Sequence, residues 1–312
     1  MRCVLGIDTS NYTTSAALVN RDGQVLADVR RLLEVKPGAR GLRQSEALFQ
    51  HVVHLPEIVR TAVETARETG SDVRIAAVAA SEKPRPRSDS YMPCFLPGCG
   101  TAQSIAAAEN VPYYAFSHQE AHIAALQPET GWRRRDGFLC LHNSGGTCEL
   151  LAVTEEGIRI VGGSRDISFG QLIDRIGVAL GMAFPAGGEM DELALTAEAD
   201  GSLPVIRAEG AWIHLSGIET AAHRLLESGR PAPQLAAELF ARIGAAVEAI
   251  CRRGAAETGL DRVLLVGGVS TSRTLRQRLS AVRTPQLHIS DTDRGRDNAV
   301  GIALLGREKL WP

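Results

Sequence analysis

The sequence predicts an α/β protein made of two duplicated lobes that face each other across a cleft. Two stretches predict this architecture, because each reads as three strands with tight turns and is followed by helices and single strands: 2–31 and 137–166. We expect a first lobe at 1–130, with 296–312 packing back on it, and a second lobe at 131–295. Ligands of open α/β sheets bind where strand ends meet loops, so binding residues are expected beside the cleft.

The elements of the first lobe follow from periodicity and turn residues. Asp22-Gly23 is a two-residue hairpin signal between the second and third strands. Helical periodicity then covers 45–70, where Gly70 ends it. A short buried strand is expected at 75–81, a proline-rich loop at 82–100, a helix at 101–111 and a strand at 112–117.

In the second lobe, helical periodicity predicts helices at 168–182 and 231–259. A strand at 262–270 then runs into a glycine turn, and a helix is expected at 272–282.

Composition restricts the class of protein. The chain has 312 residues, 44% of them hydrophobic, and a net charge of −2, so a large core is expected and no global basic field attracts nucleic acid. No secretory signal and no run of about 18 apolar residues is visible, so we expect no membrane partner. The six cysteines form no C-x-x-C pair. A cytoplasmic protein with reduced thiols fits these features.

Two histidines in "AFSHQEAHIAAL" are the first candidate site. His118 and His122 are four residues apart, so both imidazoles lie on one face of a helix and are able to share one ion. Two ligands hold a divalent ion poorly, so a third ligand from another segment is needed.

Three glycine pairs stand at predicted strand ends: Gly145-Gly146, Gly187-Gly188 and Gly267-Gly268. Glycine lets backbone N–H groups approach a phosphate, although ordinary tight turns explain any single pair. Together the pairs favour a nucleotide, but no Walker or Rossmann fingerprint is present. Asp8 ends the first strand, where it suits a role near a cation or phosphate or is simply a solvated carboxylate.

Six motifs occur in an order that resembles the glycoprotease-like TsaD family, whose best-known members are tRNA threonylcarbamoyl transferases. They are "VLGIDTSNYTTSAAL", "HQEAH", "SGGT", "LIDRIGVALGMAFPAGG", "LLVGGVSTSRTLRQRL" and "RDNAVGIA". The resemblance covers nearly the whole chain. It implies two RNase H-like lobes of the actin, sugar-kinase and Hsp70 type.

The resemblance also implies a set of site residues. The metal, iron or zinc, would be held by His118, His122 and Asp297. An adenine nucleotide or threonylcarbamoyl-adenylate would place its phosphates against Ser144, Gly145, Gly146 and Thr147. Its sugar would contact Asp174 and Gly187, and its adenine the turn at Gly267, Gly268 and Ser272. Asp8 and Asn11 are the candidate catalytic residues.

Several positions depart from the family pattern. Tyr12 and Thr13 replace two acids, Thr147 replaces His or Asn, Ser272 replaces an Asn, and "SEKPRPRSDSYMP" replaces a glycine-rich loop. With these changes the chain looks like a divergent paralogue within the resemblance. His142 stands where some relatives carry a metal-binding tyrosine, so it is either a fourth metal ligand or a structural histidine. His51 and His54, three residues apart, are expected to be a half-exposed helical pair without a site.

Three functions remain to be weighed. A peptidase is disfavoured, because Gln119 stands where zincins carry the basic glutamate and Glu120 is expected to point away from the imidazoles. A metal-dependent threonylcarbamoyl or carbamoyl transferase with an adenylate donor is the leading hypothesis. The alternative is a nucleotide-binding regulatory subunit, or an enzyme for another acceptor.

The partners implied are tRNA, accessory proteins resembling TsaB and TsaE, or a second copy of the chain. Basic residues in two loops either contact tRNA phosphates or are simply solvated: Lys83, Arg85, Arg87 and Arg133–Arg135.

Overall fold

A computed structural model describes residues 1–10, 12–35, 42–69, 72–289 and 299–312. The chain divides into two compact units, which are described separately. The described residues of the first lie within Met1–Val35, Gly41–Glu129 and Asp297–Pro312, and those of the second lie within Thr130–Arg296. None of the helices in these ranges is both long enough and apolar enough to cross a membrane.

The first unit is built on a five-stranded sheet of order β3-β2-β1-β4-β5. Its strands are β1 (Arg2–Thr9), β2 (Thr13–Asn20), β3 (Val25–Leu32), β4 (Arg74–Lys83) and β5 (Tyr113–Ser117). β1, β2 and β3 form an antiparallel meander, whereas β4 and β5 are parallel to β1. Gly23 adopts a φ of 86° in the predicted β2–β3 turn, which the Asp-Gly signal anticipates.

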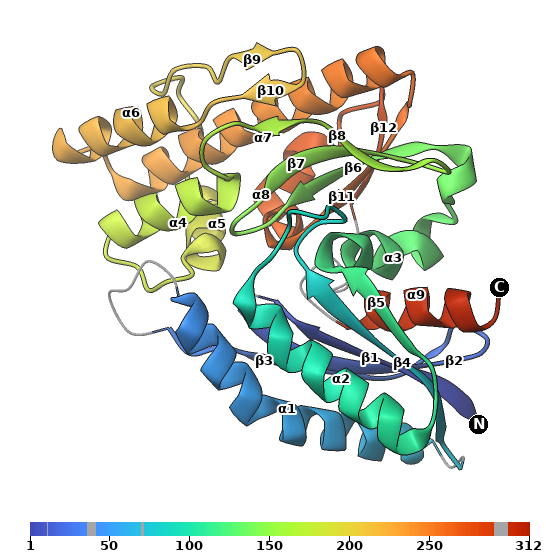
Figure 1. Ribbon diagram of the computed structural model, residues 1–312. Helices are drawn as coiled ribbons and strands as arrows, with labels where there is room; N and C mark the ends of the chain where they lie inside the picture. The colour runs from blue at the N-terminus through green and yellow to red at the C-terminus, as the bar shows by residue number, and fades with distance from the viewer. Residues whose placement is uncertain (11, 36–41, 70–71, 290–298) are drawn as a thin grey trace. The chain divides into compact units, whose positions relative to one another are not determined.

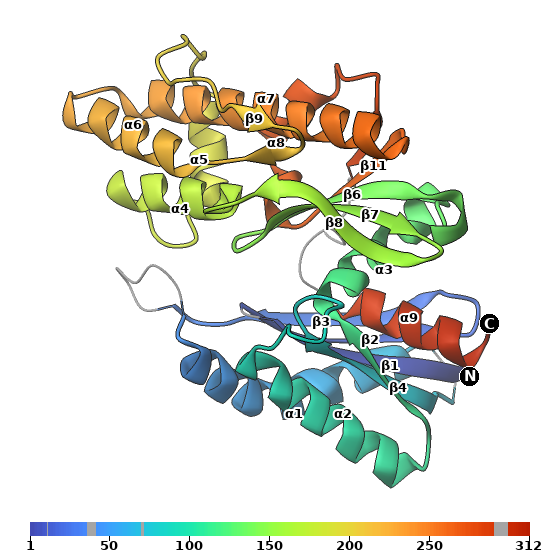
Figure 2. The same cartoon turned by 45° about the horizontal axis from the view of Figure 1, so that its top comes forward.

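Helices cover both faces of this sheet (Figure 1). The helices α1 (Gln44–Arg67) and α2 (Leu96–Glu109) pack on one face, and α9 (Val300–Leu310) packs on the other (Figure 2). Side chains of β2 alternate between the two cores, because successive residues of a strand point to opposite faces: Leu18 packs toward α1, and Val19 packs toward α9. A side chain at Gly6 would lie 2.6 Å from the Ala299 carbonyl oxygen, so β1 and the start of α9 are in close contact.

The proline-rich segment differs from its prediction as a continuous loop. A short 3₁₀ helix, η1 (Pro93–Phe95), leads directly into α2, which begins at Leu96 rather than at Thr101. Pro97 lies in the first turn of α2, where proline is tolerated because the N–H groups have no helical partner. The helix therefore starts five residues earlier than the prolines suggest.

The second unit repeats the arrangement of the first around a seven-stranded sheet of order β12-β11-β6-β7-β8-β10-β9. Its strands are β6 (Phe138–Asn143), β7 (Cys148–Thr154), β8 (Gly157–Ser164), β9 (Ala208–Glu209), β10 (Trp212–Ile213), β11 (Arg262–Val266) and β12 (Gln286–Ile289). β6, β7 and β8 form the meander, and β11 and β12 are parallel to β6. This confirms the predicted duplication, since each unit has a three-stranded antiparallel meander and two further strands parallel to its first strand.

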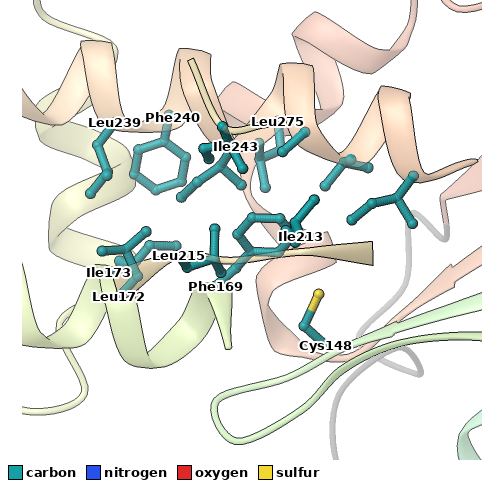
Figure 3. Packing of buried hydrophobic residues seen from close by; sticks show 14 of the residues in the cluster. Cys148, Phe169, Leu172, Ile173, Ile213, Leu215, Leu239, Phe240, Ile243 and Leu275 are labelled. Carbon is teal, nitrogen blue, oxygen red and sulfur yellow. The ribbon is translucent and has the colours of Figure 1, made fainter. Parts of the chain in front are cut away.

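Helices of the second unit enclose one large core. They are η2 (Arg134–Asp136), α4 (Phe169–Ala179), α5 (Gly187–Ala194), α6 (Ser216–Glu227), α7 (Ala232–Thr258), η3 (Gly268–Thr271) and α8 (Arg273–Leu279). In Figure 3, Phe240 and Ile243 of α7 face Phe169 and Leu215, and all four are buried. Burying a side chain of this size contributes about 1.5–3 kcal/mol, so this core fixes the start of α4 beside the β6–β7 loop.

Candidate metal and nucleotide sites

The histidine helix α3 (His118–Thr130) begins immediately after β5. A capping box sets its first turn: Glu120 N donates to Ser117 Oγ at 3.2 Å, and Ser117 N and Oγ donate to Glu120 Oε2 at 3.0 and 2.8 Å. Glu120 is therefore engaged at the helix start, which supports the argument against a zincin-type base.

His118 and His122 converge on one point. Their Nε2 atoms are 3.0 Å apart, and the ring planes are close to perpendicular. Two nitrogens bound to one zinc ion at about 2.0–2.1 Å, with an angle of about 90–110° between them, lie about 2.9–3.4 Å apart. The spacing of the two imidazoles thus fits a shared divalent ion.

Asp8 orients His118 from the end of β1. Its Oδ1 lies 2.9 Å from Nδ1 of His118 and accepts a hydrogen bond from Ser81 Oγ at 2.5 Å. The carboxylate is 0% exposed, so it is not the solvated strand-end residue of the alternative interpretation. A carboxylate that accepts from Nδ1 leaves the Nε2 lone pair of the ring for a metal. Within the described residues, Oδ2 of Asp8 has no hydrogen-bond partner.

The two further predicted ligands, Asp297 and His142, and the candidate catalytic residue Asn11 are not tested by the described part of this site. Asp297 and Asn11 lie outside the described residues. His142 is buried on β6, which belongs to the second unit, so its role as a ligand stays a prediction. Across the described ranges no group of three His, Cys, Asp or Glu side chains forms a metal site. The two imidazoles, oriented by Asp8, therefore provide only part of a coordination sphere.

The candidate phosphate loop joins β6 to β7. Ser144 N donates to the Thr147 carbonyl at 2.9 Å, which closes a tight turn around Gly145 and Gly146. From the start of α4, Ser168 Oγ donates to the Gly145 carbonyl at 2.7 Å. A side chain at Gly146 would have no heavy atom within 4 Å, so this glycine faces open space.

The turn after β11 lies against this loop. Gly267 has a φ of 91°, and a side chain there would lie 2.5 Å from the Asn143 carbonyl oxygen. Gly267 is thus required both by its backbone conformation and by close approach to the end of β6. Gly268 opens η3 directly after it. Two of the predicted nucleotide segments are neighbours in the second unit.

The side chain of Asp174 accepts hydrogen bonds from backbone N–H groups at the start of α5, where Gly187 lies. Oδ1 of Asp174 accepts from Ala186 N at 2.9 Å, and burial raises the pKa of Asp174. Gly187 begins α5, and its N–H lowers the same pKa in part. Asp174 therefore supports the start of α5 in this structure.

Ser272 has a structural partner that the sequence did not indicate. Its Oγ donates to Oδ1 of Asp191 at 2.6 Å, and it also caps α8 by accepting from Leu275 N at 3.1 Å. Asp191, on α5, additionally accepts from Arg273 N and Thr274 N at 2.7 and 3.1 Å. This buried carboxylate links α5 to the N-terminus of α8, where a negative charge is favourable. A single aspartate in an otherwise ordinary helix carries no sequence signal for this role.

The prediction that His51 and His54 are half-exposed is wrong. His51 is 0% exposed and His54 is 7% exposed, because α1 packs this face against β2. Nδ1 of His51 lies 2.8 Å from Thr14 Oγ1, and Nε2 lies 2.8 Å from the Ser10 carbonyl oxygen. Buried imidazoles need such partners, and Thr14 was not recognised as one from sequence.

Three of the six basic loop residues lie beside acidic side chains. Lys83 pairs with Glu82 at 3.0 Å, Arg87 pairs with Asp89 at 3.0 Å, and Arg135 lies 3.9 Å from Asp136. These exposed pairs favour the solvated interpretation over a dedicated phosphate-binding surface.

Fold and geometry together define a class. The duplicated units are those of the actin, sugar-kinase and Hsp70 type, with a histidine pair in one unit and glycine turns in the other. Solved structures share this fold: HypF of T. kodakarensis has a TM-score of 0.64 at 14% identity, covering 99% of this chain and 47% of its own. A ROK family glucokinase from Streptomyces griseus has a TM-score of 0.53 at 14% identity, covering 98% and 99%.

The family is shown by sequence. The model of the TsaD family, tRNA N6-adenosine threonylcarbamoyltransferase, matches residues 31–304, and the chain belongs to this family. The tRNA N6-adenosine threonylcarbamoyltransferase of Thermus thermophilus is 32% identical over 305 residues, which cover 96% of this chain and 91% of the relative. The protein of the same name from Methanopyrus kandleri is 29% identical over 314 residues, covering 98% and 87%.

Proposed function

We propose that the protein is a metal-dependent acyltransferase that moves a threonylcarbamoyl group from an adenylate to an adenosine of tRNA. The observation that carries the proposal is the pair of Nε2 atoms, from His118 and His122, converging at 3.0 Å, with Nδ1 of His118 bonded to Asp8. Family membership over residues 31–304 supports the reaction type.

The residues of the first unit would hold iron or zinc. Imidazole nitrogens suit both metals, and Asp8 keeps the donor nitrogen of His118 directed at the ion. When bound, the metal would supply Lewis-acid polarisation of the donor and a clamp on its phosphate. Asp297 is proposed as a further ligand on the strength of the family resemblance, and His142 as a fourth.

The glycine turns of the second unit would hold the adenylate. Gly145 and Gly146 leave open space for the phosphates, with Ser144 and Thr147 closing the turn. Asp174 and Gly187 would contact the sugar, and the segment from Gly267 to Ser272 would contact the adenine. The turn at Gly267 lies against Asn143 and Ser144, next to the proposed phosphate loop, and this supports one shared site for the adenylate.

The transfer step balances without an oxidant or reductant. The amino nitrogen of the acceptor adenosine bonds to the carbamoyl carbon, and the bond from that carbon to the phosphate oxygen breaks. AMP leaves with the electron pair, and the amine loses its proton to solvent. Asp8, and Asn11 in the same segment, are proposed to act closest to the acceptor side of this step.

Partners and location belong to the same proposal. The acceptor is tRNA, with accessory proteins resembling TsaB and TsaE, and a homodimer is the further possibility to test. The six cysteines are free thiols, which fits the reducing cytoplasm.

The test supplies threonylcarbamoyl-adenylate, unmodified tRNA and candidate partner proteins, and then measures modified adenosine by mass spectrometry. Modified adenosine that disappears in His118→Ala supports the proposal. Donor turnover without modified tRNA would identify a different acceptor. No donor turnover, with nucleotide still bound, would favour a regulatory subunit instead.

A further inference from the structure

A buried hydrogen-bond chain crosses from α1 to the tip of the β1–β2 hairpin. His51 contacts the Ser10 carbonyl oxygen through Nε2 and Thr14 Oγ1 through Nδ1, both at 2.8 Å. Nδ1 of His54 lies 3.4 Å from the same Thr14 hydroxyl. All four residues belong to the first unit, and none is more than 7% exposed.

The chemistry of the partners sets the direction of each hydrogen bond. The Ser10 carbonyl only accepts, so Nε2 of His51 must carry a proton. Burial lowers the pKa of His51 to about 4, so the ring is neutral near pH 7 and Nδ1 is an acceptor. Thr14 therefore donates its hydroxyl proton to His51, and its oxygen is left to accept from Nδ1–H of His54. One tautomer of His51 satisfies every partner.

These hydrogen bonds hold the short connection between β1 and β2, which begins after Asp8. His51 is hydrogen-bonded to both Ser10 and Thr14, and these two residues stand on either side of Tyr12 in sequence. On the opposite side, Leu33 N donates to the Tyr12 carbonyl at 2.9 Å. Asp8 itself is tied to the same hairpin, because its carbonyl accepts from Ser15 Oγ at 3.3 Å. The connection is thus held from the helix side by His51 and from the strand side by Leu33.

We propose that His51 is a positioning residue for the transfer step, acting through the β1–β2 connection that carries Ser10 and Tyr12. This inference rests on the proposed function. Among the described hydrogen bonds of His51 none joins His118 or His122, and the glycine turns belong to the other unit, so its loss should leave metal and nucleotide binding intact. Turnover is expected to depend on this connection, because the proposed catalytic residue Asn11 stands between Ser10 and Tyr12 in sequence and small displacements of such a group lower rates strongly.

The kinetic experiment compares His51→Phe, His51→Gln and His54→Phe in the full chain. Phe removes both hydrogen bonds, whereas the amide of Gln can still donate to the Ser10 carbonyl. We expect kcat to fall about tenfold or more in His51→Phe and to recover to within about threefold of the unmutated protein in His51→Gln. KM for tRNA, bound metal and nucleotide affinity should stay unchanged. His54→Phe, a matched buried control that leaves Ser10 bonded, should stay within about threefold.

A second measurement does not depend on activity or on the stability of a variant. Nitrogen-15 NMR of the unmutated protein should show His51 protonated at Nε2 and not at Nδ1 at pH 7, with slow exchange of the Nε2 proton. Thr14→Val removes the hydroxyl at nearly constant shape, so it should change the nitrogen-15 chemical shift of Nδ1 of His51.

The outcomes separate the two proposals. Protonation of His51 at Nδ1, or full activity of His51→Phe, overturns the positioning role. Parallel loss of metal, nucleotide and turnover in His51→Phe also overturns it, because the effect is then a general loss of structure. Absence of modified tRNA from the unmutated protein contradicts the proposed function, while the NMR result still decides the tautomer of His51.

Discussion

Nδ1 of His118 and Oδ1 of Asp8 lie 2.9 Å apart, although 110 residues separate them in sequence. The strand β1 ends at Thr9 beside β4, and α3 begins where β5 ends, so the sheet order brings both residues to one edge. Because Asp8 also accepts from Ser81, its carboxylate is fixed before any ligand arrives. This relationship supplies the orientation that a lone histidine pair lacks.

Replacing Asp8 with Asn should weaken metal binding by about 10–100-fold, because removing a carboxylate behind a metal-binding histidine costs about that much affinity. The amide is nearly isosteric, but it lacks the charge that raises the basicity of His118. Zinc affinity measured by chelator competition checks this. Asp22→Asn, at an exposed turn, is the control and should bind as the unmutated protein does. Equal affinity in both variants would show that Asp8 has no part in the site.

Replacing both His118 and His122 with Ala should abolish the bound metal, expected at about one ion per chain, because both converging donors are then lost. Elemental analysis of the purified protein measures this directly. His214→Ala removes a largely exposed imidazole elsewhere and serves as the control. If the double variant retains as much metal as the control, the ion binds at another place.

Local sequence pattern predicted the elements and the pairs that a single element determines. The one-turn spacing of His118 and His122 placed both rings on one face, and Asp22-Gly23 marked the hairpin, because each depends only on neighbouring residues. The duplicated strand order followed from the same hairpin signals repeated in the second unit. The start of α2 was missed, because Pro97 was taken as a loop residue rather than a residue of the first helical turn.

Partnerships between distant segments could not be predicted in this way. The bonds from Asp191 to Ser272 and from His51 to Ser10 join residues 81 and 41 positions apart. Their formation depends on how α5 packs beside α8 and how α1 packs on β2. A buried polar side chain also looks like an exposed one in sequence, which is why His51 was placed at the surface.

Gly146→Val should weaken adenine-nucleotide binding by more than about tenfold, or about 1.4 kcal/mol, because the added side chain fills the space proposed for the phosphates. No heavy atom lies within 4 Å of the position its Cβ would take, so the fold should tolerate the change. Calorimetry with AMP and ATP measures the affinity. Gly217→Val, at another open position of the same unit, is the control. Lack of adenine-nucleotide binding by the unmutated protein would contradict the proposed site. It would also contradict both the threonylcarbamoyl and the carbamoyl transferase hypotheses.

The free energy of unfolding should fall as the pH is lowered from about 6.5 toward 4, and His51 should account for a measurable part of this. Burial lowers the pKa of His51 from 6.5 to about 4, so between these values the unfolded chain binds a proton that the folded chain does not. The contribution of neutral His51 to the free energy of unfolding is therefore fully present above pH 6.5. Below pH 6.5 it decreases as the pH falls, with a slope of at most about 1.4 kcal/mol per pH unit for one group.

Urea unfolding of the metal-free protein at several pH values between 7.5 and 5 tests this, with His51→Gln as the reference. Gln does not titrate, so the stability difference between the unmutated protein and His51→Gln should decrease as the pH falls. His54→Gln should retain the pH dependence due to His51, since it leaves the bond from His51 to Ser10 in place. A difference that stays constant across this range would mean that His51 carries the same charge in the folded and unfolded chains, contrary to its burial beside Thr14.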